Sequence, residues 1–431
     1  MNRVSYGIYI KMKSNTNEGG TGRELGPTML SALVASVLSL VLNLYHFSLQ
    51  GTGGLYTWHP LLILKVILFM GLVPLATALL YLLFFKRGPG GLRIVLRWFS
   101  LLVSALVSLV SVALLAYLII VPRLGTLEIP ALSLIDPAKG LTPAIRSEIE
   151  DSGTAAEPLL RLSFASDPHW GAETAHAEAR TQILKAIGEH TVDGFFMLGD
   201  TVETGNGAAA WNEALADLGN FIPQMSLRVL LGNHDALFGG QYLFKKAFFP
   251  KGFSSDSGSP FYWSLDAKAA TIIALNLPWG TENFGSHQRR WLEQTLAAAD
   301  HSKPIIVISH SYFYASGYDD PDYGSPWYDH YQNISKLVPL FETYKVNLVI
   351  SGHNHYQELL THNGVTYAIV GSMGGVPDPQ PAYVSPASRW IAVDQFGWLD
   401  VDLFKDRMLL TFRSETGSVR YQTSIDLSGP K

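Results

Sequence analysis

The sequence predicts an α/β domain of two packed sheets with helices outside, preceded by an all-α membrane region. Three long apolar stretches in the first 121 residues predict the membrane region, since each can cross a bilayer as a helix. After residue 157, continuous apolar runs alternate with helix-like segments, as in buried parallel sheets. The expected organisation is a leader over residues 1–27, membrane helices within 28–121, a linker over 122–157 and a globular domain over 158–431.

The composition excludes several kinds of function. The chain has 431 residues, of which 48% are hydrophobic, and it contains no cysteine. Disulfides, thiolate metal sites and cysteine nucleophiles are therefore excluded. Residues 1–123 carry ten Lys/Arg and two acids, whereas residues 124–431 carry 21 Lys/Arg and 34 acids. Because a globular part this acidic lacks the basic surface of a nucleic-acid binder, we expect no nucleic acid partner.

The membrane region is expected to contain three transmembrane helices, over residues 28–47, 61–85 and 98–121. A cleaved signal peptide is the alternative for the first stretch, but a polar leader precedes it and no A-x-A cleavage site follows it. Lys65 lies near one end of the second stretch. Its side chain either extends to the membrane surface or takes part in transport. Anchoring is the simpler interpretation of all three stretches.

Flanking charges set the expected orientation of these helices. Four Lys/Arg lie in the leader and four more in residues 86–97, whereas the loop between the first two stretches has none. The positive-inside rule then places the N-terminus in the cytoplasm and the globular domain outside it. We therefore expect an integral protein of a bacterial inner membrane or plasma membrane, with membrane lipids as partners.

The globular domain places polar residues where its predicted strands end. "LLRLSFAS", "VDGFFML", "LRVLL", "IIVIS" and "VNLVIS" are typical of buried strands, and "AEARTQILKAIGEH" and "SHQRRWLEQTLAAA" of helices. "FYWSLDAKAATIIALNL" and "WLDVDLFKDRMLLTF" are closer to antiparallel strands. Ligands of α/β sheets bind at the carboxyl ends of strands. The side chains expected to converge there are Asp167, His169, Asp200, Asn233, His234, His310, His353 and His355.

These side chains offer carboxylate oxygens, an amide oxygen and imidazole nitrogens, but no sulfur. Such donors suit Zn, Mn or Fe. They are more numerous than one tetrahedral ion needs, so we expect two divalent metal ions with a carboxylate such as Asp200 shared between them. Two neighbouring ions polarise a phosphoryl oxygen and activate the water between them, which favours hydrolysis of a phosphoester.

The ordered series "DPH", "GDTVE", "GNHD", a later "SH" and "GHNH" resembles the signature of the calcineurin-like metallophosphoesterases, over roughly residues 158–375. The resemblance implies a four-layer αββα sandwich, in which two packed mixed sheets are flanked by helices. It implies that one metal ion is held by Asp167, His169, Asp200 and His355, and the other by Asp200, Asn233, His310 and His353. It further implies that His234 protonates the leaving oxygen or stabilises the transition state, and that Asp235 orients the imidazole of His234.

Several features near the predicted site are open to two interpretations. Glu203 stands where purple acid phosphatases have a tyrosine, so an iron–tyrosinate centre is not expected, and Glu203 is either a site acid or a solvated loop acid. Residues 312–331 carry eight aromatics and four aspartates, and form either a substrate-facing loop or a self-packed cap. Trp170 and Trp279 are rim or core residues, and "GSMGG" at 371–375 is interpreted as a turn near the site.

These observations predict a membrane-anchored, metal-dependent phosphoesterase whose nucleophile is metal-bound hydroxide. A phosphodiester and a phosphomonoester both fit as substrate, and anchoring suggests a lipid-linked or cell-envelope phosphoester. The alternative is a membrane sensor or scaffold whose esterase-like domain binds a phosphorylated ligand without turnover, although the intact His234 argues against it. A transporter is disfavoured because the apolar stretches lack acidic residues, and a protease because no H-E-x-x-H or serine-elbow motif is present.

Overall fold

The computed structural model describes residues 90–144, 157–281, 284–320 and 325–428, with residues 34, 36–38, 40, 41, 72, 75, 76 and 79. The first two predicted membrane stretches therefore lie almost wholly outside the described residues. The chain divides into two compact units, one of residues 1–46 and 64–115 and the other of residues 47–63 and 116–431.

Helix α5 (Gly90–Leu124) covers the third predicted apolar stretch and confirms its helical conformation. Its large apolar side chains include Trp98, Leu102, Leu106 and Leu109, each more than half exposed. Within the described part of the chain, no helix combines the length and the apolar character needed to cross a membrane. The three predicted transmembrane helices therefore have no support from the described residues.

The larger unit contains a mixed six-stranded sheet. Its strands lie in the order β15 (Val419–Asp426), β14 (Arg407–Ser414), β13 (Gly397–Leu403), β1 (Leu160–Ala165), β2 (Gly194–Met197) and β3 (Leu227–Val229). Strands β1, β2 and β3 are parallel, whereas β13 pairs antiparallel with both β1 and β14. The sequence "WLDVDLFKDRMLLTF" thus forms an antiparallel pair, as its pattern predicts.

A mixed seven-stranded sheet packs against the first. Its order is β12 (Ser388–Ala392), β10 (Gln357–His362), β11 (Val365–Val370), β9 (Leu348–Ser351), β6 (Ile305–Ser309), β5 (Thr271–Ala274) and β4 (Trp263–Asp266). Strands β5, β6, β9 and β11 are parallel, and β4 pairs antiparallel with β5. A short ribbon of β7 (Asp319–Asp320) and β8 (Ser325–Pro326) lies outside both sheets.

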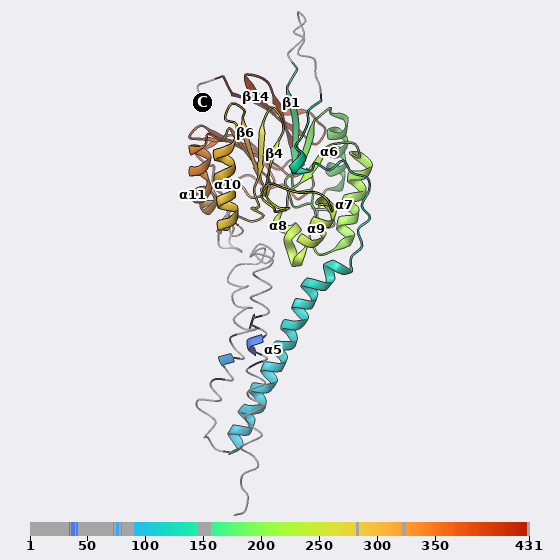
Figure 1. The fold of residues 1–431 in the computed structure, drawn as a ribbon, viewed down its shortest axis with the longest axis vertical. Helices are drawn as coiled ribbons and strands as arrows, with labels where there is room; N and C mark the ends of the chain where they lie inside the picture. The colour runs from blue at the N-terminus through green and yellow to red at the C-terminus, as the bar shows by residue number, and fades with distance from the viewer. Residues whose placement is uncertain are drawn as a thin grey trace, which may run out of the picture. The chain divides into compact units, whose positions relative to one another are not determined.

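Helices cover the outer face of each sheet and complete four layers. Helices α6 (Ala177–Glu189), α7 (Ala208–Phe221) and α9 (Gln241–Phe248) pack on the six-stranded sheet, and α10 (Ser286–Ala298) and α11 (Tyr331–Thr343) on the other. Figure 1 shows α6 and α7 on one side of the strands, and α10 and α11 on the other. The inner faces meet in an apolar core that includes Phe164, Phe196, Ile272 and Ile308. The predicted sandwich of two mixed sheets flanked by helices is therefore confirmed.

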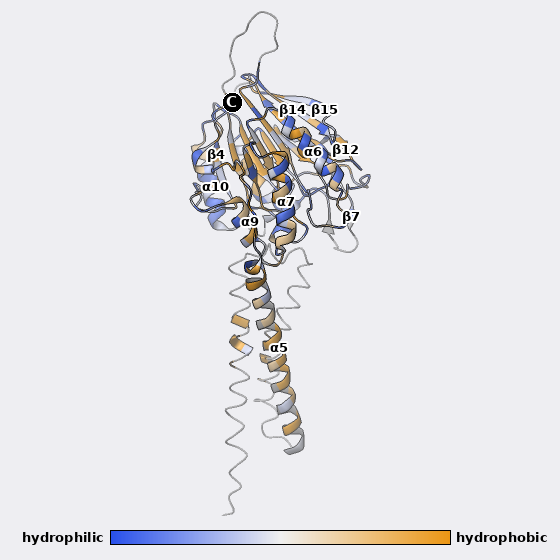
Figure 2. Ribbon diagram, turned by 90° about the vertical axis from the view of Figure 1, so that its right-hand side faces the viewer, coloured by the Kyte–Doolittle hydropathy of each residue, from blue (hydrophilic) through white to orange (hydrophobic). Residues whose placement is uncertain are grey.

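The helices have one apolar side toward a sheet and a polar side toward solvent. In α6 the buried side chains include Ile183, Leu184 and Ile187, which follow a helical spacing. Figure 2 shows the strands as mainly hydrophobic and the covering helices as mixed in polarity. Helix α6 and helix α10 fall where the sequence predicts them, within one residue at the C-terminal end.

Part of the predicted linker packs into the larger unit. The backbone N–H of Ile135 donates to Leu227 O at 2.9 Å, and the N–H of Leu227 donates to Ser133 O at 2.8 Å, so this segment extends the sheet beside β3. Ile135 and Leu141 are each 5% exposed and belong to the core between the sheets. The short helical turn Pro137–Lys139 lies between them. Residues 133–141 are therefore a structural part of the folded domain.

Candidate metal centre

The predicted site residues all follow strands at their carboxyl ends. Asp167 and His169 come after β1, Asp200 after β2, and Asn233 and His234 begin the short helix α8 (Asn233–Ala236) after β3. From the other sheet, His310 follows β6, and His353 and His355 follow β9. All five strands are parallel strands of their sheets. The two sheets therefore deliver their polar side chains to one edge of the sandwich.

Sharp backbone turns aim these side chains inward. Asp167, His169, Asp200 and His353 adopt positive φ angles of 57°, 48°, 48° and 71°, a region that few non-glycine residues occupy. Such strain is held only where surrounding contacts impose it, and it is common at functional sites. Gly232 is required for another reason, since a Cβ atom there would lie 2.1 Å from the backbone nitrogen of Asp200.

One group of ligand atoms is formed by Asp167, His169 and His355. The Nε2 atoms of His355 and His169 lie 3.5 Å and 3.9 Å from Oδ1 of Asp167. Oδ1 of Asp167 and Nε2 of His169 are buried and have no hydrogen-bond partner. Unsatisfied buried polar atoms are rare, and two of them facing each other fit a cation between them. This group therefore suits a metal ion.

A second group is formed by Asp200, Asn233, His310 and His353. Nε2 of His310 lies 3.3 Å from Oδ2 of Asp200, and Oδ1 of Asn233 lies 2.9 Å from Nε2 of His310 and 3.0 Å from Nδ1 of His353. The two ring nitrogens are themselves 3.2 Å apart. Four donor atoms of nitrogen and oxygen thus converge on one point, and the group also suits a metal ion.

Asp200 joins the two groups. Its Oδ2 atom lies 3.3 Å from His310 in the second group and 3.8 Å from Nε2 of His169 in the first. Its Oδ1 atom accepts a hydrogen bond of 2.8 Å from the backbone N–H of His234. The carboxylate is therefore placed where a ligand shared by two ions would be.

Neighbouring carbonyls fix the rings of two histidines. Nδ1 of His310 lies 2.9 Å from Leu198 O, and Nδ1 of His355 lies 2.7 Å from Val376 O. A ring that donates from Nδ1 to a carbonyl leaves Nε2 as the nitrogen that binds a metal once its proton is lost. Both rings are held in this way with Nε2 toward the site.

The charges of the site favour ionised carboxylates and a neutral His353. Burial alone would raise the pKa of Asp200, but the charges of His310 and His234 outweigh it and hold that pKa well below its usual value. Burial lowers the pKa of His353 well below its usual value, and the positive charge of His310 adds to this effect. Ionised Asp and neutral His are the states in which these side chains bind metals.

Glu203 is the site residue whose role the sequence leaves open. Its Oε2 atom lies 2.7 Å from Nδ1 of His169, and its backbone carbonyl lies 2.8 Å from Nδ1 of His234. Glu203 therefore supports two site histidines, although its side chain is 40% exposed. Its position three residues after Asp200, where purple acid phosphatases have a tyrosine, is the signal that singles it out.

Asp235 has partners other than the predicted one. Its two carboxylate oxygens accept hydrogen bonds from the backbone N–H groups of Gly232, at 2.9 Å, and Val202, at 3.0 Å. These bonds close the turn that starts α8, whereas the imidazole of His234 is held by Glu203. The predicted orienting role of Asp235 is corrected accordingly: Asp235 fixes the backbone that carries Asn233 and His234.

The residues around both groups enclose a cavity of about 310 Å³. Its lining consists of His169, Asp200, Asn233, His234, Leu237, Trp279, Tyr318, Trp327, His353, His355 and Asp378. The ring of His353 stacks on Tyr312 and on Trp327, with centroids 5.8 Å and 5.2 Å apart and interplanar angles of 21°. Trp279 lies edge-on to both Trp327 and His353, at 5.3 Å and 5.0 Å. One end of the cavity is thus aromatic.

The two candidate rim tryptophans differ. Trp279 lines the cavity, whereas Trp170 is fully buried, donates from Nε1 to Asp217 at 2.8 Å and carries the guanidinium of Arg180 over its ring. Trp170 is therefore a core residue of the α6 and α7 layer.

Two side chains of the aromatic segment 312–331 face the cavity, and the base of the segment is fixed to a sheet. Tyr318 and Trp327 line the cavity, and the N–H of Trp327 donates to Tyr318 O across the ribbon at 2.9 Å. The base of the segment is fixed from the seven-stranded sheet, because the buried carboxylate of Glu358 accepts hydrogen bonds from the N–H and Oγ of Ser316. The segment is a supported rim with two side chains turned to the site.

The "GSMGG" run lies against the site histidines. The N–H of Gly375 donates to Asp167 O at 2.8 Å, and a Cβ atom on Gly375 would lie 2.6 Å from Cε1 of His355 and 2.7 Å from Cδ2 of His169. Three residues on, Asp378 accepts hydrogen bonds from the N–H of His355 at 2.8 Å and from Tyr318 Oη at 3.3 Å. Asp378 is a cavity residue that sequence reasoning missed, since no motif marks it.

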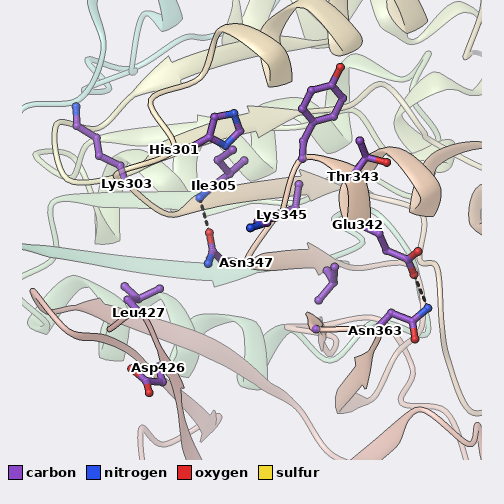
Figure 3. A pocket seen from close by; sticks show the side chains of 14 residues that line it. His301, Lys303, Ile305, Glu342, Thr343, Lys345, Asn347, Asn363, Asp426 and Leu427 are labelled. Carbon is purple, nitrogen blue, oxygen red and sulfur yellow. Dashed lines mark hydrogen bonds between the residues drawn. The ribbon is translucent and has the colours of Figure 1, made fainter. Parts of the chain in front are cut away.

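A larger cavity of about 700 Å³ lies at the opposite, amino ends of β6, β9 and β11 (Figure 3). Its polar groups pair with one another: Oδ1 of Asn347 accepts from the N–H of Ile305 at 3.0 Å, and Asn363 donates to Glu342 at 2.9 Å. None of the predicted site residues lines it.

Part of the chain matches a known protein family. Residues 160–357 match the family of calcineurin-like phosphoesterases, whereas a comparison with curated proteins gives no match. Among solved structures, a purple acid phosphatase from yellow lupin (Lupinus luteus) seeds is 18% identical with a TM-score of 0.53. The alignment covers 62% of this chain and 53% of the lupin chain, so this chain spans about half the length of that phosphatase.

Two further structures are similar over the same part of the chain. PhoD is 12% identical, with a TM-score of 0.48, and covers 63% of this chain and 69% of its own. GAP50, described as the anchor in the inner membrane complex of Plasmodium, is 20% identical, with a TM-score of 0.44, and covers 62% of this chain and 88% of its own. At these identities the likeness concerns the fold alone.

Proposed function

We propose that this chain hydrolyses a phosphodiester or a phosphomonoester, because residues 160–357 match the calcineurin-like phosphoesterases, a family of phosphoester hydrolases that use two divalent metal ions. One observation carries the proposal: two groups of buried metal-ligating atoms meet at the carboxylate of Asp200. Five of these ligating residues, His169, Asp200, Asn233, His353 and His355, line the cavity, so ions that they hold would be open to a substrate. That arrangement is the one used to clamp a phosphoryl group.

The proposed ligands follow from the two groups. Asp167, His169, Asp200 and His355 would hold one ion, and Asp200, Asn233, His310 and His353 the other. When bound, the two ions supply positive charge to the phosphoryl oxygens and lower the pKa of water. Manganese, iron and zinc all accept these nitrogen and oxygen donors.

His234 is proposed as the proton donor to the leaving alcohol. It lines the cavity, its ring centroid lies 4.7 Å from that of His169, and Nδ1 is held by the carbonyl of Glu203. This leaves Nε2 to face the substrate. In the reaction, the oxygen of water bonds to phosphorus, the bond from phosphorus to the leaving oxygen breaks, and that oxygen takes a proton from Nε2 of His234.

We further propose that the chain is anchored in a membrane and that its catalytic domain lies outside the cytoplasm. The proposed substrate is a lipid-linked or cell-envelope phosphoester. The anchoring is supported by the three apolar stretches of the sequence and by the excess of Lys/Arg beside them. Protease treatment of intact vesicles tests the orientation. A domain outside the cytoplasm is cleaved from the outside without lysis, and protection of the domain would contradict the proposed side.

Catalysis is tested with purified full-length protein, loaded with Mn²⁺, on a chromogenic phosphodiester and the matching monoester. We expect Asp200→Ala to abolish turnover, and His234→Ala to lower kcat by about 10²–10⁴-fold with the metals retained. His287→Ala is the control, because His287 is exposed on α10 and outside the cavity.

The sensor or scaffold interpretation makes the opposite prediction. Protein that binds two metal ions and a phosphorylated ligand but turns over neither ester would contradict the hydrolase and favour a binding role. Metal content therefore has to be measured in the same samples.

A further inference from the structure

The cavity of the metal centre has two chemically different ends. His234 lies against His169, with ring centroids 4.7 Å apart, whereas Trp279 and Trp327 lie against His353, at 5.0 Å and 5.2 Å. His169 and His353 belong to the two different ligand groups. The proton donor and the aromatic rings therefore flank opposite halves of the proposed two-metal site.

The aromatic end is built to receive a ligand group. Trp279, Tyr318 and Trp327 line the cavity, and all three are partly exposed rather than buried. The two tryptophan rings meet edge to face, with an interplanar angle of 86°. A backbone hydrogen bond of 2.9 Å joins Trp327 to Tyr318, and the carboxylate of Glu358 fixes Ser316, two residues before Tyr318. Fixed aromatic faces that border a cavity are suited to apolar or cationic groups.

Charge favours a cation over an anion at this end. Among the described residues that line the cavity, none is Lys or Arg, although phosphate-binding sites commonly use them. The acid Asp378 lines the cavity and contacts both ends, because it accepts a hydrogen bond from Tyr318 Oη at 3.3 Å and another from the N–H of His355, in the His169 group, at 2.8 Å. A second anionic group on the substrate would therefore meet a carboxylate and no compensating side chain, whereas a cation would meet a carboxylate and aromatic faces.

We propose that Trp279, Tyr318, Trp327 and Asp378 form a subsite for a small alkylammonium group on the alcohol that stays bonded to phosphorus. The inference rests on the proposed hydrolase function and makes the substrate a phosphodiester. The leaving alcohol lies at the His234 end and the retained alcohol at the aromatic end. Water adds to phosphorus, the leaving alcohol departs with a proton, and the product is the phosphomonoester of an ammonium-bearing alcohol.

The test compares two diesters of equal shape with the full-length, Mn²⁺-loaded protein in a sugar detergent. One is 4-nitrophenyl phosphocholine, and the other is 4-nitrophenyl 3,3-dimethylbutyl phosphate, in which carbon replaces the ammonium nitrogen. We expect kcat/KM to favour the cationic ester by on the order of tenfold, the scale of a cation–π contact with a nearby carboxylate. Equal kcat/KM values would overturn the subsite while leaving the hydrolase intact.

Substitutions in the proposed subsite test whether these residues cause the preference for the cationic ester. Trp279→Leu and Asp378→Asn should each reduce the ratio of the two kcat/KM values toward one, with two metal ions still bound. Trp291→Leu is the matched control, since Trp291 lies on α10 and donates to Asp256 away from the cavity. A ratio that stays unchanged in both subsite variants would contradict the proposal.

A binding measurement is independent of turnover. Calorimetric titration of the Mn²⁺-loaded protein with phosphocholine and with 3,3-dimethylbutyl phosphate should give tighter binding of phosphocholine, and Asp378→Asn should narrow the difference. Equal affinities for the two compounds would overturn the subsite. If neither diester is hydrolysed, this titration still decides the inference, whereas the hydrolase proposal fails separately.

Discussion

The site depends on a few contacts between two neighbouring loops, which carry Asp200, Glu203 and His234. Asp200 touches both ligand groups and receives the N–H of His234, and Glu203 holds His234 through its carbonyl and His169 through its carboxylate. Residues 200–203 and 233–234 therefore position metal ligands and the proton donor together.

Glu203→Gln tests the support of His169. The amide keeps the size of the side chain but removes the charge that faces Nδ1 of His169 at 2.7 Å. Loss of such a partner typically weakens metal binding by about 10–100-fold. We expect calorimetric titration with Mn²⁺ to show one weakened site and one unchanged site. Glu293→Gln is the control, because Glu293 pairs with Arg289 on the exposed side of α10, and unchanged affinity at both sites would contradict the role of Glu203.

Gly375→Ala tests the contact of the "GSMGG" turn with the ligands. The new methyl group would lie 2.6 Å from Cε1 of His355 and 2.7 Å from Cδ2 of His169, so the two rings have to move apart. Since both rings belong to one ligand group, we expect loss of one metal ion per chain, measured by elemental analysis. Gly285→Ala is the control, because a Cβ atom on Gly285 meets no other atom within 4 Å, and this variant should keep two metal ions per chain. Full metal content in Gly375→Ala would show that the turn yields instead.

At the scale of elements, the strands were predictable because their signal is local. β1, β2, β3, β6 and β9 coincide with continuous apolar runs, and the polar residues that end them meet because parallel strands share an edge. Asp378 and the stacking of Trp327 on His353 depend instead on how the rim segment folds over the sheet. No periodicity encodes such contacts. Residues 133–135 likewise carry too short a pattern to reveal their pairing with β3.

Helix α11 provides a pH-dependent contribution to stability. Nδ1 of His330 accepts from the N–H of Asn333 at 3.3 Å and caps the helix, and burial lowers the pKa of His330 from 6.5 to about 4. The unfolded chain therefore binds a proton between about pH 6.5 and pH 4 that the folded chain excludes. The stability that neutral His330 contributes is present above pH 6.5 and is lost as the pH falls through this range.

His330→Asn isolates this effect, because asparagine can cap a helix without titrating. We expect the free energy of unfolding of the wild type, relative to the variant, to fall by about 1–2 kcal/mol between pH 7 and pH 4.5. Denaturant titrations at several pH values measure the difference. For exposed His287→Asn, the difference in free energy of unfolding from the wild type should not change with pH. If the difference for His330→Asn does not change with pH either, the cap does not titrate in this range.

At the scale of the whole domain, the boundary before β1 lies earlier than the apolar runs alone suggest. Ile135 and Leu141 are buried between the sheets although they precede β1, and Leu141 donates its N–H to Asp266 O at 2.9 Å. We expect a chain beginning at residue 157 to be less stable than one beginning at residue 125 by about 3–5 kcal/mol, from the loss of two buried aliphatic side chains.

Denaturant unfolding of the two truncated chains measures this difference. In the full chain, Ile135→Ala should cost about 2–4 kcal/mol through the cavity that it leaves. If the chain beginning at residue 157 is as stable as the longer one, the segment 133–141 is not part of the cooperative fold.

The order of strands in the six-stranded sheet has a consequence for biosynthesis. Asp167 and His169 directly follow β1, which lies between β2 and β13, yet β13 begins at Gly397, after the last ligand, His355. A ribosome-bound chain that has just released His355 therefore holds every ligand but lacks a neighbour of β1. We expect nascent chains stalled before residue 397 to take up no stable metal pair, and chains stalled well after β13 to do so. Metallation would then report that translation of the domain is nearly complete.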